Sequence, residues 1–203
     1  MDREIWLRRA LVLVAGTMVY NAVEAGVALW AGTVASSVAL VGFGFDSVIE
    51  LAAATVVLWR MAIEARGADT TRVAAAENRV RRFVGVTFFV LAAYVLIQSV
   101  WNLWTENPPA ESAVGIVLAL ISLMVMPLIA VGKFKVADVL DSRALRAEAK
   151  ETLACSYLSF CLFLGLVANA VVGWWWADPV AAILMVPWLV KEGLEAFEDE
   201  PCC

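Results

Sequence analysis

Two short units of acidic and sulfur-containing residues interrupt long apolar stretches of this chain. In the first unit Glu50 follows Asp46 by four residues, and in the second Cys155 follows Glu151 by four residues. Residues at this spacing lie on one face of a helix, about one turn apart, so each unit presents two potential ligands in one direction. Three carboxylates and one thiol are suited to a tetrahedral site for a divalent transition metal.

The surroundings of these residues are hydrophobic. Of the 203 residues, 63% are hydrophobic and 17% are charged, whereas soluble domains carry roughly 25% charged residues. The apolar runs are long enough to cross a bilayer, and the first, from about Ile5 to Trp30, lacks the cleavage site of a signal peptide. We therefore expect an integral, multi-pass membrane protein whose surroundings are the lipid bilayer.

The same inventory excludes other classes of protein. A net charge of -5 is not typical of nucleic-acid binding, and the four cysteines do not form the pattern of a secreted disulfide framework. The chain has no histidine and no nucleophile–base motif, so it is not expected to be an enzyme or to hold a prosthetic group.

An all-α fold with six transmembrane helices is predicted. A tight turn is expected at 31–33, a polar linker at 62–81, a proline-induced break at 106–109 and an interfacial turn at 174–176, with Asp178 capping the sixth helix. The six predicted spans are 5–30, 34–61, 82–104, 112–135, 146–172 and 176–197.

Basic residues predict the orientation of these helices. All fifteen fall on one side of the six-helix topology, and the three opposite loops contain none. The positive-inside rule then makes both termini cytoplasmic, and we expect a prokaryotic inner membrane as the location. The basic residues are Arg3, Arg8, Arg9, Arg60, Arg66, Arg72, Arg79, Arg81, Arg82, Lys133, Lys135, Arg143, Arg146, Lys150 and Lys191.

The two metal-binding units belong to an internal repeat. Ser37–Leu40 precedes Asp46 in the same way that Ser142–Leu145 precedes Glu151, and the two copies lie 105 residues apart. The copies fall on the second and fifth helices, which run in opposite directions, so residues 1–197 would form an inverted-topology 3+3 repeat. Such repeats are typical of secondary transporters that bind ions near the bilayer midplane.

Structural roles for the same residues compete with this interpretation. Asp46 could cap an unwound segment, Cys155 could be a small buried hydrophobe, and Glu151 could lie outside the hydrocarbon. Against these roles, each ionisable group at the bilayer centre costs about 2.5–3.5 kcal/mol on insertion scales, which makes function the default interpretation.

Other polar residues have less specific roles. Asn21 and Glu24 on the first helix could support the ligands or add one, and Glu24 could instead attract cations at the outer vestibule. Asp138, Asp141 and Glu148 alternate with basic residues, which favours surface ion pairing. Gly42 and Gly44 are expected to allow close helix packing.

The chain resembles the cation diffusion facilitators, which export divalent metals in exchange for protons. The resemblance rests on the motifs Asp46-x-x-x-Glu50 and Glu151-x-x-x-Cys155, on the S-x-A-L before each, and on the segments 145–149 and 173–179. In that family the equivalent four positions bind the transported metal. The resemblance implies a homodimer and a metal/proton antiporter that works by alternating access.

Two departures from the family pattern limit the expectations. Zinc members usually have histidine in the site, and the family's C-terminal cytoplasmic domain is not expected after residue 197, where 198–203 would form a short cytoplasmic tail. A mixed carboxylate–thiolate site makes Zn²⁺ the first choice of cargo, with Cd²⁺, Co²⁺, Fe²⁺ or Mn²⁺ as alternatives. The competing functional hypothesis is a membrane protein that binds metal as a sensor or scaffold without transporting it.

Overall fold

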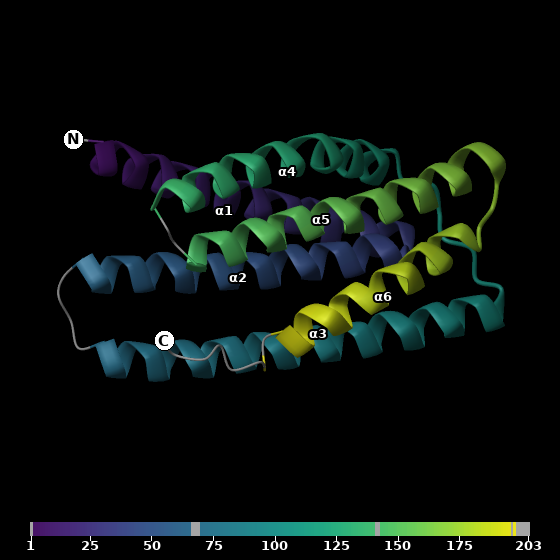
Figure 1. The fold of residues 1–203 in the computed structure, drawn as a ribbon. Helices are drawn as coiled ribbons and strands as arrows, with labels where there is room; N and C mark the ends of the chain where they lie inside the picture. Colours follow the sequence, from purple (N-terminus) through teal and green to yellow (C-terminus); the bar gives the residue numbers. More distant parts are fainter. Residues whose placement is uncertain (1, 66–69, 141–142, 196, 198–203) are drawn as a thin grey trace.

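A computed structural model describes residues 2–65, 70–140, 143–195 and 197, which form six α-helices and one π-helical turn (Figure 1). No strand occurs within these ranges, in agreement with the all-α prediction. The predicted tail, 198–203, lies outside them. The helices are α1 (Asp2–Ala35), α2 (Val38–Ala65), α3 (Thr70–Thr105), α4 (Ala113–Leu140), α5 (Arg143–Val167) and α6 (Ala177–Glu195), with the π-helical turn η1 at Ala168–Val172.

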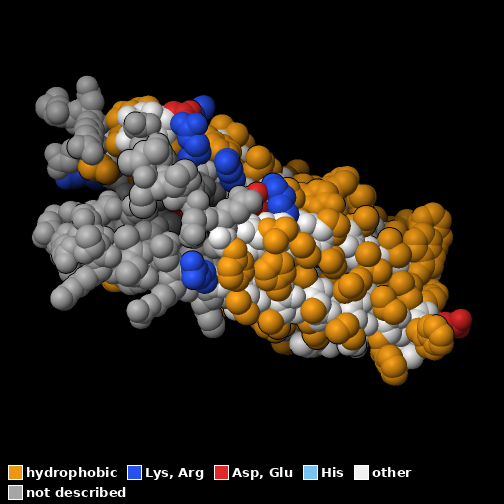
Figure 2. Space-filling model, turned by 60° about the horizontal axis from the view of Figure 1, so that its bottom comes forward, with side chains coloured by type: hydrophobic (Ala, Val, Ile, Leu, Met, Phe, Trp, Pro, Cys, Tyr) orange, Lys and Arg blue, Asp and Glu red, His pale blue; other side chains and the backbone are white. Residues whose placement is uncertain are grey.

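Five of the helices are long and apolar enough to cross a bilayer. The candidate spans are Ile5–Ala35, Val38–Val56, Gly85–Thr105, Ala113–Leu140 and Glu148–Val172. Helix α6 is not among them, and its 19 residues include Asp178, Lys191 and Glu192. The face of the bundle in Figure 2 is largely apolar away from the end where Lys and Arg gather. Outward-facing apolar side chains of this extent are typical of a multi-pass membrane protein.

The helices pack in pairs, with α1 along α2, α4 along α5 and α3 along α6. Helix α2 also packs against α5 and α6, so the two helices that carry the predicted ligands meet inside the bundle. Figure 1 shows that α1 begins at the same end of the bundle at which α2 ends, α3 begins, α4 ends and α5 begins.

The turn between the first two helices lies later than predicted. Helix α1 continues through 31–33 as far as Ala35, and the chain reverses at Ser36, which has a φ of 55°. Gly32 is instead a point of close contact, since a Cβ there would lie 2.8 Å from the backbone nitrogen of Val41. The glycine that suggested a turn therefore allows α1 to approach α2.

The predicted packing roles of Gly42 and Gly44 are confirmed. A Cβ on Gly44 would lie 3.0 Å from the backbone nitrogen of Leu29 in α1, and one on Gly42 would lie 3.0 Å from the Val95 side chain in α3. The start of α2 is therefore held closely between two neighbouring helices.

The predicted polar linker at 62–81 is wrong in extent. Helix α2 continues to Ala65 and α3 already begins at Thr70, so most of the stretch is helical. The Ala, Arg and Glu residues of this stretch are strong helix formers. A fall in hydropathy therefore marks where the apolar segment ends, and a helix can continue beyond that point.

Asp178 has a different role from the one predicted. It lies in the first turn of α6, but its carboxylate accepts hydrogen bonds from the Ser37 hydroxyl and, at 3.0 Å, from the backbone N–H of Val38. These groups stand at the start of α2, where the helix leaves backbone donors without internal partners. Asp178 therefore caps α2 and ties it to α6.

Candidate metal centre

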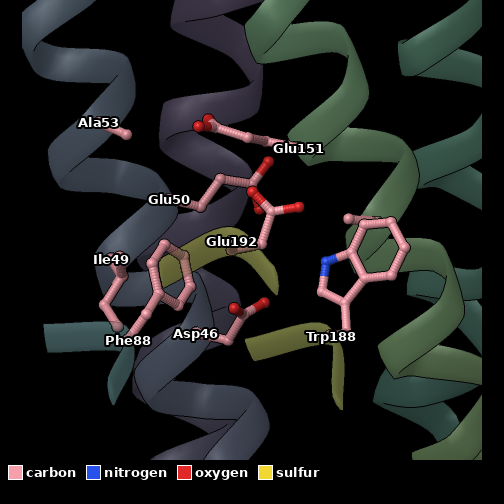
Figure 3. Close-up of a pocket in the computed structure, with 9 residues that line it drawn as sticks. Asp46, Ile49, Glu50, Ala53, Phe88, Glu151, Trp188 and Glu192 are labelled. Atoms are coloured by element: carbon pink, nitrogen blue, oxygen red, sulfur yellow. The ribbon is translucent and has the colours of Figure 1, made fainter. Parts of the chain in front are cut away.

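A buried pocket lies where α2, α3, α5 and α6 meet (Figure 3). Helices α2, α5 and α6 present side chains at spacings of three or four residues, as expected for one helical face turned toward a common space, and α3 adds a single side chain. Among the described residues that line the pocket, four of nine are carboxylates and none is basic. The lining residues are Asp46, Ile49, Glu50 and Ala53 of α2, Phe88 of α3, Glu151 and Ala154 of α5, and Trp188 and Glu192 of α6.

Three of the four predicted ligands line this pocket. Asp46 and Glu50 retain only 7% and 6% of their side-chain exposure, and Glu151 faces them from α5 with partial exposure. Cys155 lies one turn farther along α5, where it is 1% exposed, has a free thiol and belongs to the apolar core. It is not among the residues that line the pocket. The structure thus brings together the carboxylates of the repeated motifs and leaves the thiol beside them.

The pocket also contains Glu192, which the sequence reasoning did not identify. Figure 3 shows its carboxylate turned toward the same space as those of Glu50 and Asp46. The available signal was an acidic residue near the end of an otherwise apolar helix, for which function is the default interpretation. The repeated motifs lie on the second and fifth predicted helices, so they give no information about the sixth helix, which carries Glu192.

The carboxylates are not arranged as a closed coordination sphere. Within the described residues, no group of three or more Asp, Glu, Cys or His side chains is placed to hold one metal ion. Coordination by several of these side chains therefore requires them to move closer together.

A hydrogen-bonded chain lies behind Glu50. The Thr152 hydroxyl lies 3.2 Å from Glu50 Oε1, joining α5 to α2, and Lys133 Nζ of α4 donates to Thr152 Oγ1 at 2.9 Å. Lys133 also forms a 2.9 Å ion pair with Glu148, and both side chains are buried. The prediction that Glu148 takes part in surface ion pairing is therefore wrong.

A second polar cluster surrounds the predicted auxiliary residues of α1. Glu24 is buried and accepts a 2.9 Å hydrogen bond from Ser47, and it also contacts Ser122 of α4. The amide oxygen and nitrogen of Asn21 are buried, and no described residue forms a hydrogen bond with either atom. Neither residue lines the pocket, but Glu24 reaches the residue that directly follows Asp46.

The cation efflux transmembrane domain matches residues 17–200. The chain belongs to the cation efflux family. That membership confirms the resemblance inferred from the paired motifs, and together with the five long apolar helices it agrees with an integral, multi-pass membrane protein.

One curated relative, from Synechocystis sp., is an uncharacterized transporter. It is 27% identical over 185 residues, which cover 86% of this chain and 60% of the relative. The chain thus spans about 60% of the length of the curated relative that it matches.

Proposed function

We propose that this protein exports a divalent transition-metal cation across a membrane. The observation that carries the proposal is the pocket between α2, α3, α5 and α6 that Asp46, Glu50, Glu151 and Glu192 line. Carboxylates are expensive to keep inside a membrane unless they serve a cation or proton pathway. The cation efflux family supports the same interpretation.

The proposed metal ligands are Asp46, Glu50, Glu151 and Cys155, with Zn²⁺ as the first choice of cargo. A thiolate favours borderline and soft ions such as Zn²⁺, Cd²⁺ and Co²⁺, whereas carboxylates alone suit Mn²⁺ and Fe²⁺. Glu192 could take the fourth place, since it lines the pocket and Cys155 does not. Asn21 and Glu24 are proposed to support the ligands from α1.

The proposed mechanism is metal/proton antiport by alternating access. The carboxylates and the thiol bind metal only when deprotonated, so protons that arrive from the opposite side compete with the cation and release it. Contacts between α1 and α4, α2 and α5, and α3 and α6 support an inverted 3+3 repeat, because each pair joins equivalent helices of the two halves.

We also propose that both termini face the cytoplasm of a prokaryotic cell and that the protein works as a homodimer in its inner membrane. The basic side chains near the ends of the candidate membrane spans, such as Arg8, Arg82, Lys135 and Arg146, support the orientation. The dimer rests on the family resemblance.

A flux measurement tests the proposed transport. Purified protein in liposomes with a trapped Zn²⁺ indicator should move Zn²⁺ when a pH gradient is imposed, and a protonophore should abolish the gradient-driven component. Liposomes without protein are the control. Zn²⁺ binding without flux would favour a metal-binding sensor or scaffold, and the absence of both would contradict the proposal.

Metal selectivity distinguishes the two candidate fourth ligands. If the Cys155 thiolate binds the ion, Cys155→Ser should weaken Zn²⁺ binding relative to Mn²⁺ by about tenfold, the lower end of the cost of disturbing a metal site. Calorimetric titration of the purified protein with each metal measures the ratio. Cys161→Ser, which changes another buried free thiol of α5, is the matched control. An unchanged ratio in Cys155→Ser, with weaker binding of both metals in Glu192→Gln, would assign the fourth place to Glu192.

A further inference from the structure

Lys133 is a fully buried base inside the apolar helix α4. Its side chain is 0% exposed, and its ammonium group donates to Glu148 Oε1 and to Thr152 Oγ1, each at 2.9 Å. A lysine in the interior of a membrane domain is costly and usually belongs to the machinery of the protein. The ion pair with Glu148 satisfies its charge but does not explain the second bond.

That second bond connects Lys133 to the candidate metal centre. Because the ammonium group donates to the Thr152 oxygen, the hydroxyl proton remains available for an acceptor. Two acceptors are in reach, namely Glu50 Oε1 at 3.2 Å and the backbone oxygen of Glu148 at 3.0 Å. The carboxylate is the stronger acceptor when it is ionised.

The two oxygens of Glu50 therefore have different surroundings. Oε1 faces the Thr152 hydroxyl, whereas Oε2 is buried and has no hydrogen-bond partner among the described residues. Glu50 is also one of the four carboxylates that line the pocket. One oxygen of this carboxylate lies within hydrogen-bonding distance of Thr152, and the other can bind a cation. Carboxylates that bind metals are commonly oriented by hydrogen bonds in this way.

The first half of the chain has a hydroxyl at the equivalent position. Ser47 follows Asp46 as Thr152 follows Glu151, at the same offset of 105 residues as the repeated motifs. Ser47 donates to the buried Glu24 of α1, just as Thr152 bonds to the buried Lys133 of α4. In each candidate ligand motif, the first acidic residue is thus followed by a hydroxyl that is tied to a buried ionisable group on the neighbouring helix.

We infer that Thr152 and Lys133 are positioning residues for cation binding: Lys133 holds the Thr152 hydroxyl, and that hydroxyl fixes Glu50 with one oxygen free for the transported ion. The inference rests on the proposed function, because it assigns Glu50 to the cation site. It predicts a change in affinity for the cation, with little change in the fold.

The matched pair Thr152→Val and Thr152→Ser tests the inference. Valine keeps the shape of threonine without the hydroxyl, whereas serine keeps the hydroxyl. Thr152→Val should weaken Zn²⁺ binding by about 10–100-fold, as expected when a group that orients a metal ligand is lost. In liposomes the KM for Zn²⁺ should rise more than the maximal flux falls. Thr152→Ser keeps the donor hydroxyl and should bind Zn²⁺ nearly as tightly as the wild type.

A double variant measures the contribution of Lys133 without leaving the buried carboxylate of Glu148 unpaired. The double variant Lys133→Met/Glu148→Gln removes both charges and should weaken Zn²⁺ binding about as much as Thr152→Val. Adding Thr152→Val to it should cost little more, because residues that act through one connection are not additive.

The outcomes separate this inference from the proposed function. Unchanged Zn²⁺ affinity in Thr152→Val, or equal losses of affinity in Thr152→Val and Thr152→Ser, would overturn the inference. The proposed function would still stand after either result if Asp46→Asn abolishes Zn²⁺ binding. If Thr152→Val lowers the melting temperature but not the affinity, the role of Thr152 is structural and the inference is also overturned. If the wild-type protein neither binds nor transports Zn²⁺, the proposed function fails and the inference falls with it.

Discussion

Replacing Asp46 by asparagine is expected to abolish metal transport while leaving the fold intact. The substitution removes one negative oxygen from the buried pocket but keeps the size of the side chain. Asp46 lies among Glu50, Glu151 and Glu192, and a neutral amide cannot replace its charge opposite a divalent ion. The loss of affinity should reach at least the ~10–100-fold that follows when a group supporting a metal ligand is removed.

Two measurements check this expectation. Zn²⁺ flux into liposomes and Zn²⁺ titration of the purified protein should both fail for Asp46→Asn, while its melting temperature in detergent stays at or above that of the wild type. Burying the charged carboxylate of Asp46 costs desolvation free energy, and a neutral amide at this position lowers that cost. The stability of Asp46→Asn should therefore not fall below that of the wild type. Asp138→Asn is the matched control, because Asp138 forms an exposed pair with Arg146. Normal flux in Asp46→Asn would exclude this pocket as the cation site.

The repeated spacing of acidic residues was sufficient to predict three of the four carboxylates that line the pocket. The i, i+4 pattern placed Asp46 and Glu50 on one face, and the copy 105 residues later placed Glu151 opposite them. Helical periodicity predicts which side chains share one face of a helix, because this property depends only on residues that are close in sequence. Periodicity cannot predict which other helix lies opposite that face, whereas the internal repeat indicated the fifth helix.

Glu192 could not be found in the same way. The residue at the equivalent position of the first half, 105 residues earlier, is Thr87, so the internal repeat contains no acidic echo of Glu192. Its place in the pocket depends on how α6 packs against α2 and α5, which is a tertiary property. The pocket is therefore less symmetric than the sequence repeat that predicted it.

The buried ion pair was missed for a different reason. Lys133 and Lys135 are close in sequence, and both count among the fifteen basic residues that predict the cytoplasmic side. Helical residues that are two positions apart point in directions that differ by about 200°. Lys133 is therefore buried while Lys135 is exposed. Arg146 and Glu148 differ in the same way. Proximity in sequence therefore did not distinguish a surface charge from an internal one.

Removing Lys133 alone should have the largest effect on stability. In Lys133→Met the carboxylate of Glu148 remains buried without its cation, and its second oxygen already has no hydrogen-bond partner within the described residues. Breaking a buried ion pair from one side costs about 3–5 kcal/mol, because it leaves an uncompensated charge. Thermal unfolding of the purified protein in detergent should show a large fall in melting temperature.

Two further variants show whether the stranded charge is the cause. Adding Glu148→Gln to Lys133→Met removes that charge and should restore most of the lost stability, since replacing a buried pair by neutral groups is often nearly neutral. Lys191→Met breaks the exposed pair with Glu195 and should cost less than about 1 kcal/mol. If Lys133→Met were no more destabilising than Lys191→Met, the carboxylate of Glu148 would have to be neutral or reached by water. In that case Lys133 would not be needed to balance it, and the second bond of Lys133, to Thr152, would remain as the only structural reason for a base at this depth in α4.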